Sequence, residues 1–173
     1  DFGKCIELNP GDKRSYNNRG LVYNGRKEYD RAIADFNKAI ELDPKSAMYY
    51  CNRGAAYDEK KEYDKALADY DKAIKLDPKY AMAYFNRGNT YKRKGEYDKA
   101  LADYSKAIEL KPNDAMAYYY RGRAYDVKAE VDKAVADFTK AIELDPKLMD
   151  AYLYRGHAYT NVGKFKEAVQ DFD

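Results

Sequence analysis

Apolar residues recur along the chain at helical spacing, in two successive stripes separated by turn residues. Tyr84, Gly88 and Tyr91 fall at i, i+4 and i+7, which places them on one face of a helix. Gly95 can close this helix in the left-handed conformation, and Pro112 cannot continue the helix that comes next. The second stripe, again with 3- and 4-residue spacing, consists of Tyr97, Ala100, Leu101, Tyr104, Ala107 and Ile108. The pattern predicts two helices joined by a tight turn.

The same two-helix pattern returns every 34 residues. The phrase Tyr-x-x-Arg-Gly-x-x-Tyr begins at residues 16, 50, 84, 118 and 152. A fixed period of this length indicates a repeat architecture, in which each helix pair buries its apolar face against its neighbours. We expect one array over 1–173 in which a partial repeat precedes four full repeats and a truncated fifth. Its segments are 1–12, 13–46, 47–80, 81–114, 115–148 and 149–173.

The small residues of the period predict where the two helices of a pair meet. Gly88 and Ala100 would let the helices approach closely, with aromatic rings filling the space around them. We therefore expect the repeated glycine to be a contact residue, although glycine costs about 1 kcal/mol in helix propensity.

These repeated positions resemble the tetratricopeptide repeat family. The matching residues in segment 81–114 are Tyr84, Gly88, Tyr91, Ala100, Tyr104, Ala107 and Pro112. Tyrosine stands where the family often has tryptophan, and arginine precedes the glycine where leucine is commoner. The resemblance implies an all-α fold, a right-handed superhelical solenoid of antiparallel helix pairs. It also implies a concave inner surface that holds an extended peptide or a partner helix.

Charged residues follow the period too. The arginine of the phrase, such as Arg87, recurs together with an aspartate in each second helix, such as Asp103. Because the guanidinium fork suits a carboxylate, we expect a structural ion pair, and replacing Arg87 with leucine should then lower stability. The alternative is a row of arginines that grips an acidic ligand. On the outer face, Asp35 and Lys38 represent a repeated i, i+3 pair that predicts a solvated surface.

The residues beside the packing stripe of each first helix differ most between repeats. They occupy positions 2, 5, 6, 9, 12 and 13 of each repeat, called the inner stripe below, and line the concave surface in the family. Met, Phe, Tyr and Leu alternate there with Asn and single charges, as is typical of a binding surface. We expect peptide contacts at Asn18, Asn52, Phe85, Asn86, Asn89, Tyr119, Tyr120, Arg123, Leu153 and Tyr154.

Asparagine recurs at the sixth position of the first three repeats. A carboxamide both donates to and accepts from a peptide backbone, so the three side chains predict a ladder that holds an extended peptide. This resembles an asparagine ladder known in the family, but Tyr120 and Tyr154 replace it in the last two repeats. We expect backbone holding first and aromatic docking afterwards; the alternative is that the asparagines are solvated. The family's carboxylate clamp is absent because no fifth position is lysine.

Composition narrows the partners. Lys and Arg number 32 and Asp and Glu 30, so a net charge of +2 gives no electrostatic reason to expect nucleic acid or an anionic membrane. No apolar run approaches the length of a membrane span. The two cysteines form no disulfide framework and weakly favour a reducing compartment such as the cytoplasm. His157 is the single histidine, and the sequence carries no catalytic, metal-binding or cofactor-binding motif.

These observations predict a non-catalytic interaction module that binds a protein or peptide along its inner stripe. The rival is a structural or consensus-like array without a dedicated ligand, because the second helices at 63–78 and 97–112 are nearly identical. Both ends of the chain fall within a repeat and leave apolar positions uncovered. We expect either that further repeats flank this stretch or that copies self-associate head to tail.

Overall fold

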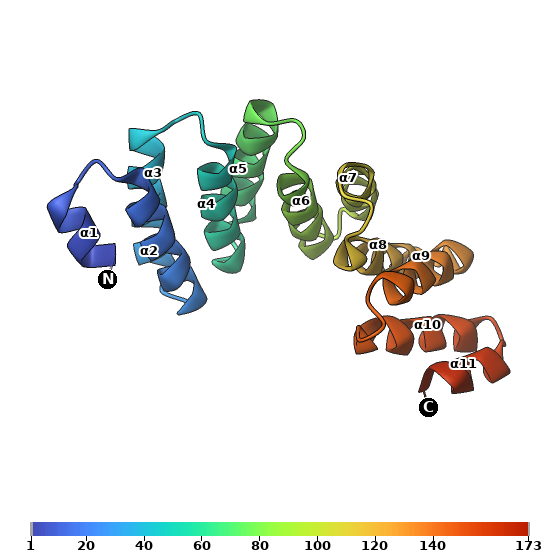
Figure 1. Cartoon of the computed structure of the whole chain (residues 1–173). Coiled ribbons are helices and arrows are strands. Elements are labelled where there is room, and N and C mark those ends of the chain that lie inside the picture. Colours follow the sequence, from blue (N-terminus) through green and yellow to red (C-terminus); the bar gives the residue numbers. More distant parts are fainter. Residues whose placement is uncertain (1, 173) are drawn as a thin grey trace. The chain divides into compact units, whose positions relative to one another are not determined.

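The computed structural model describes residues 2–172, and every regular element within that range is an α-helix (Figure 1). The predicted segment ends Asp1 and Asp173 lie outside the described residues. The chain divides into two compact units, residues 1–90 and 91–173, called unit 1 and unit 2 below. The helices are α1 (Phe2–Leu8), α2 (Lys13–Gly25), α3 (Tyr29–Leu42), α4 (Ala47–Glu59), α5 (Tyr63–Leu76), α6 (Ala81–Arg93), α7 (Tyr97–Leu110), α8 (Ala115–Val127), α9 (Val131–Leu144), α10 (Met149–Asn161) and α11 (Phe165–Phe172).

Consecutive helices pack as hairpins, and the hairpins pack on one another within each unit. In unit 1, α2 pairs with α3 and α4 with α5, while α3 also packs on α4 (Figure 1). In unit 2, α8 pairs with α9 and α10 with α11, while α7 packs on α8 and α9 on α10. The predicted all-α fold of stacked helix pairs is therefore confirmed.

The turn inside each hairpin needs one residue in the left-handed region. Gly95 has a φ of +78° there, which confirms its predicted role as a helix-ending glycine. Lys61 and Ala129 hold the equivalent place with φ values of 63° and 59°, although a side chain makes this conformation costly. The second helices end two residues before a proline, as α5 does at Leu76, where Asp77 caps the helix ahead of Pro78.

The repeated glycine lies where a hairpin is narrowest. A Cβ atom built on Gly54 would lie 2.8 Å from Cε1 of Tyr70, and one on Gly122 would lie 2.9 Å from Cε1 of Phe138. Both rings are almost fully buried. The prediction that the glycine is a contact residue is confirmed, because any larger residue would push the ring out of the core.

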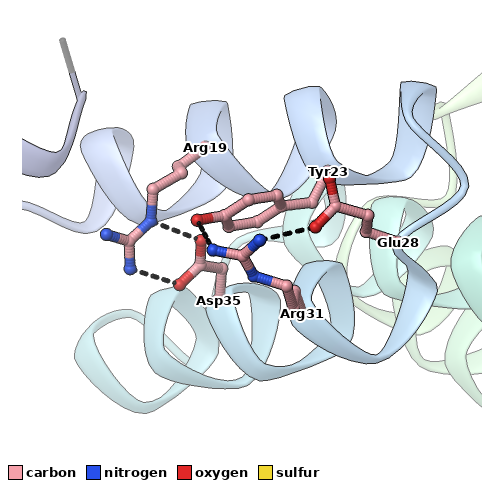
Figure 2. A network of polar contacts seen from close by, with 5 residues as sticks. All are labelled: Arg19, Tyr23, Glu28, Arg31 and Asp35. Atoms are coloured by element: carbon pink, nitrogen blue, oxygen red, sulfur yellow. Dashed lines mark hydrogen bonds and ion pairs between the residues drawn. The ribbon is translucent and has the colours of Figure 1, made fainter.

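The repeated arginine and aspartate join the two helices of a hairpin. Figure 2 shows Arg19, whose Nε and Nη2 atoms each donate to one carboxylate oxygen of Asp35 at 2.8 Å. The expected structural ion pair is thus confirmed, and the carboxylate is buried. A neighbouring arginine in Figure 2, Arg31, binds Glu28 and the Tyr23 hydroxyl on the exposed side. The same two-pronged contact forms in Arg53–Asp69, Arg121–Asp137 and Arg155–Asp171.

The third nitrogen of these arginines reaches the preceding hairpin. Nη1 of Arg53 donates to Asn37 at 2.6 Å, and Nη1 of Arg121 donates to the Ser105 hydroxyl at 3.2 Å. Arg155 reaches Thr139 in the same way at 3.0 Å. Each guanidinium therefore binds one helix of its own hairpin and one of the hairpin before it. The hydrogen bonds to Asp69 raise the pKa of Arg53, so its positive charge is secure.

The expected i, i+3 pairing between aspartate and lysine on the outer face is corrected. Asp35 faces the interior of the hairpin and binds arginine, so it is not available to lysine. Lys38 instead donates to Glu41, one turn further along, at 2.7 Å. Lys140 likewise donates to Glu143 at 2.9 Å. The outer face does carry solvent-exposed charge pairs, but glutamates supply the negative partners.

Candidate functional site

The inner stripe lies on the first helix of each hairpin, and these first helices contact each other within each unit. In unit 1, α2 contacts α4, and in unit 2, α8 contacts α10. Side chains at the fifth, sixth and ninth positions of neighbouring first helices therefore meet. The chemistry of these meetings differs between the two units.

In unit 1 the meetings are made by carboxamides. Nδ2 of Asn52 donates to Oδ1 of Asn17 at 2.8 Å, and Nδ2 of Asn86 contacts Sγ of Cys51 at 3.5 Å. Each bond runs from the sixth position of one repeat to the fifth position of the repeat before. Asn17 also donates to Oδ1 of the exposed Asn18 at 3.4 Å. Asn52 and Asn86 are thus held in place, and each keeps its side-chain oxygen as an acceptor.

Three inner-stripe residues of unit 1 are closed to a partner, and one of them is Asn17, which is 3% exposed. Cys51 is 1% exposed, and burial raises the pKa of its thiol to about 11, so it is a packed and unreactive side chain. Asp58 is also buried, and it accepts a hydrogen bond from the hydroxyl of the buried Thr90 at 2.8 Å. The inner stripe is consequently narrower than its sequence positions predict.

The open part of unit 1 is largely apolar. Leu21, Met48 and Met82 have between 43% and 47% of their surface exposed. Phe85 and Asn89 are half-buried on α6. These apolar side chains provide contact area for a partner, and covering them breaks no hydrogen bond of the neighbouring amides.

In unit 2 aromatic rings replace the carboxamides. Tyr119 packs edge-on against Tyr120 at 5.1 Å between ring centroids and against Tyr154 at 6.0 Å. Phe138 of the hairpin core lies 6.2 Å from the Tyr119 ring. Rings from α8 and α10 therefore form one connected cluster, and the half-buried Tyr120 and Tyr154 form its accessible part.

The prediction that Tyr119 is an exposed contact residue is wrong. Only 4% of its surface is exposed, because it lies between the first helices and the Phe138 ring. Burial also raises the pKa of its hydroxyl. Tyr119 packs beneath the accessible rings of Tyr120 and Tyr154 as part of the core. Leu153 on α10, another predicted contact residue, is 44% exposed.

Two cations lie on these rings. The guanidinium carbon of Arg123 is 3.6 Å from the centroid of Tyr154, and Nη1 donates to the Tyr119 hydroxyl at 3.0 Å. Nζ of Lys92 is 4.3 Å from the centroid of Tyr120. Such cation–aromatic contacts contribute about 0.5–2 kcal/mol each and hold the charged groups in place. The exposed His157 lies at the edge of the cluster, 6.3 Å from the Tyr154 ring.

Sequence reasoning missed two parts of this surface. Asn17 emerged as the acceptor for Asn52, and Lys92 as a cation placed on a ring. The signal for Asn17 is the 35-residue spacing, which pairs a fifth position with the sixth position of the next repeat. Lys92 had no such signal, because period alone does not say which way a long flexible side chain turns.

Neither a membrane-spanning helix nor a metal-binding cluster is found among the described residues. No helix between residues 2 and 172 combines the length and the apolar character that crossing a bilayer requires. Among the same residues, no three His, Cys, Asp or Glu side chains are grouped so as to hold a metal ion.

Each hairpin within a unit is joined by the repeated ion pair between arginine and aspartate, called the clamp below, and leaves part of its first helix accessible. These features define a class of helical-repeat proteins that interact with other proteins. Family comparison agrees, because a tetratricopeptide repeat model matches residues 14–46, 81–114 and 115–148. Two further repeat models of this family match residues 57–95 and residues 36–68 and 138–170. The chain belongs to the tetratricopeptide repeat family. Comparison with curated proteins found no match.

Solved structures resemble the chain over most of its length. One is MamA, at 30% identity and a TM-score of 0.80, covering 88% of this chain and 90% of that chain. Another is YrrB, described as a tetratricopeptide protein with an unusual peptide-binding site, at 28% identity, a TM-score of 0.75, and coverage of 98% and 88%. Pseudomonas aeruginosa PilF has a TM-score of 0.88 at 22% identity, covering 93% and 73%, which shows the fold alone.

Proposed function

We propose that the inner stripe binds a peptide segment or partner helix of another protein, and that the chain acts without catalysis. The observation that carries the proposal is the difference between packing and inner-stripe positions. The clamp and core residues repeat from hairpin to hairpin, whereas the accessible first-helix residues combine apolar, amide and aromatic side chains. The similar structure of YrrB, a tetratricopeptide protein with a peptide-binding site, supports the same function for this array.

The two units support two binding modes. In unit 1, the oxygens of Asn52 and Asn86 can accept hydrogen bonds from peptide N–H groups, because the amides are oriented by their own donated bonds. The exposed Met48 and Met82 supply adaptable apolar contact beside them. In unit 2, Tyr120 and Tyr154 offer ring faces and edges to apolar or aromatic side chains of a partner.

A display selection with random dodecapeptides tests this proposal. Peptides should enrich on the native protein, and binding should fall about tenfold or more in Phe85→Ala and Tyr154→Ala, the usual size for an interface hot spot. Lys140→Ala, on the exposed outer face of α9, is the matched control and should bind as the native protein does. Melting temperatures must stay close to the native value in all three variants. Binding that survives both aromatic replacements would contradict the proposal.

The second candidate is a structural array without a ligand in this stretch. It is favoured by the sequences of α5 and α7, which differ at only two positions. The same selection separates the candidates, because an array without a ligand enriches no peptide family and loses nothing in the alanine variants.

Self-association is a further part of the proposal on partners. Phe165 and Val169 on α11 are 64% and 56% exposed, and they line one open surface together with Lys166 and Gln170. This surface can receive an apolar helix face of a second copy in a head-to-tail contact, which would extend rather than close. Sedimentation over a hundredfold concentration range should show a rising mean mass that Val169→Glu abolishes. A constant monomer mass would contradict this part.

A further inference from the structure

Arg123 differs from the arginines that build the fold. Arg53, Arg121 and Arg155 each bind an aspartate at 2.6–2.8 Å, whereas Arg123 has no carboxylate at ion-pair distance among the described residues. It is nevertheless held firmly, by the Tyr154 ring on one side and the Tyr119 hydroxyl on another. A half-buried, oriented guanidinium with an unpaired charge is the feature that the proposed function leaves unexplained.

Among the described residues, most of the hydrogen-bonding capacity of Arg123 is unused. A guanidinium carries five N–H groups in a planar fork, and here one nitrogen donates to Tyr119. The stacked ring of Tyr154 fixes the plane of the fork and removes the rotational freedom that a free arginine would lose on binding. The side chain is therefore organised in advance for a planar, doubly accepting group.

The nearby acids do not neutralise it. Asp126 follows Arg123 on α8 at i+3, the spacing of a helix ion pair, and yet the two do not pair in the described structure. Burial, and after it the charge of Asp150 on α10, raises the pKa of the Tyr119 hydroxyl. Asp150 thus lies in the same field, but it forms no ion pair with Arg123 in the described part of the chain. A second cation, Lys92, sits on the adjacent ring of Tyr120.

We propose that Arg123 and the Tyr154 ring form a pocket for the side-chain carboxylate of an aspartate or glutamate in the bound peptide. The inference rests on the proposed function and names the chemistry that unit 2 selects. The carboxylate would accept two parallel N–H bonds from the guanidinium, while the acid's methylene groups lie against the rings of Tyr154 and Tyr120. Asp150 weakens the local positive field.

Parallel selections on the native protein and on Arg123→Gln test the pocket. The probe is a random dodecapeptide display library, with the frequency of Asp and Glu among enriched peptides as the readout. Acidic residues should be several-fold over-represented on the native protein and fall to the library level on Arg123→Gln. Arg31→Gln, which removes an exposed arginine of unit 1, is the matched control and should keep the acidic preference. Circular dichroism of each variant checks that the fold is retained.

A synthetic version of the most enriched peptide sharpens the test. Replacing its acidic residue by the matching amide should weaken binding to the native protein about tenfold and leave binding to Arg123→Gln unchanged. Asp150→Asn should increase the preference for the acid by a few-fold, and Arg123→Lys should keep only part of it, because lysine lacks the fork.

Two failures can be told apart. If peptides enrich on the native protein without acidic preference, or with the same preference on Arg123→Gln, the carboxylate pocket is refuted and the peptide-binding function stands. If no peptide enriches on any variant, the proposed function fails, and the pocket falls with it.

Discussion

Unit 1 and unit 2 are built from the same hairpins but connect their first helices by different chemistry. In unit 1 the connection is a hydrogen bond between side-chain amides, as from Asn52 to Asn17. In unit 2 it is a cluster of rings around the buried Tyr119, with Arg123 bonded to its hydroxyl. A hydrogen bond between amides is strongly directional and leaves an amide oxygen free to accept from a partner. Contacts between rings are less directional and leave apolar surface for a partner.

The difference lies at very few positions. The clamp of arginine and aspartate is the same in both units, as Arg53–Asp69 and Arg121–Asp137 show. The contacts between first helices change because the fifth, sixth and ninth positions carry different side chains in the two units. The clamp therefore sets hairpin packing in both units alike, whereas the fifth position serves both packing and inner-surface chemistry, because Cys51 and Tyr119 are buried in the core clusters.

The largest effect should come from breaking the shared clamp. Arg53→Leu and Arg121→Leu should each lower the free energy of unfolding by about 3–5 kcal/mol, because a buried aspartate loses its counter-charge. Urea titration followed by circular dichroism measures the loss. Arg31→Leu, which breaks an exposed pair, is the control and should change stability little. A small loss for either clamp variant would show that its unit does not depend on the clamp.

The two connections themselves should differ in strength. Tyr119→Ala removes a buried ring and should cost about 3 kcal/mol, whereas Asn52→Ala removes one hydrogen bond and should cost about 1 kcal/mol. The same urea titrations measure both. Equal losses would mean that the amide and aromatic connections are energetically equivalent.

Alkaline pH should weaken unit 1 in particular. Burial raises the pKa of Cys51 to about 11 and that of Tyr80 to about 12, from ordinary values of 9.0 and 10.0. Between these values the unfolded chain has lost protons that the folded chain retains, so stability falls as pH rises from about 9 to 11. The loss attributable to Cys51 should reach about 1–2 kcal/mol at about pH 10.5.

Unfolding at a series of alkaline pH values checks this prediction. Cys51→Ala should flatten the decline with pH, although it also removes the acceptor of Asn86. An identical slope in the native protein and in Cys51→Ala would contradict the assignment.

A gain of about 1 kcal/mol should follow from completing a bond in unit 1. Oδ1 of Asn24 is buried without a partner among the described residues, whereas the equivalent Asp58 accepts from Thr90. The residue 34 positions before Thr90 is Ala56, which cannot donate. Ala56→Thr should supply the missing donor and raise the free energy of unfolding by about 1 kcal/mol. Ala56→Val, of similar shape without the hydroxyl, should give no gain.

The smallest effect concerns the hairpin turns. Ala129→Gly should raise stability by about 0.5 kcal/mol, because glycine relieves the left-handed strain but adds freedom to the unfolded chain. Gly95→Ala should lower stability by about 1 kcal/mol, since its space is open and only the backbone conformation opposes a side chain. Thermal melts of both variants provide the measurement, and a change of the same sign in both would contradict the strain argument.

The period of the sequence was enough to predict the fold. The helix pairs, the left-handed Gly95, the close contact at Gly54 and the pairing of Arg53 with Asp69 follow from small, aromatic and charged residues at fixed spacing. Each depends on backbone geometry or on a short, rigid contact. Features of this kind repeat whenever the residue repeats, so a single period suffices to find them.

The inner surface was predictable only as a set of positions. Helical spacing placed Tyr119 beside the packing stripe, but the ring turned into the space between first helices, where Phe138 covers it. Likewise, periodicity did not predict that Nδ2 of Asn52 donates to Asn17, which leaves its oxygen for a peptide. Rotamer choice decides these outcomes, and it depends on neighbours 35 residues away in the chain rather than on local periodicity.

The third contact of the repeated arginine has a consequence for how such an array can be rearranged. Its acceptor on the preceding hairpin is an amide at Asn37, a carboxylate at Asp71, and hydroxyls at Ser105 and Thr139. Because any short oxygen-bearing side chain fits this joint, the joint sets the spacing of hairpins without restricting which hairpin comes next. A hairpin with a chosen inner surface could therefore be moved to another place in the array. In this way the order of amide and aromatic surfaces along the chain could be changed one hairpin at a time.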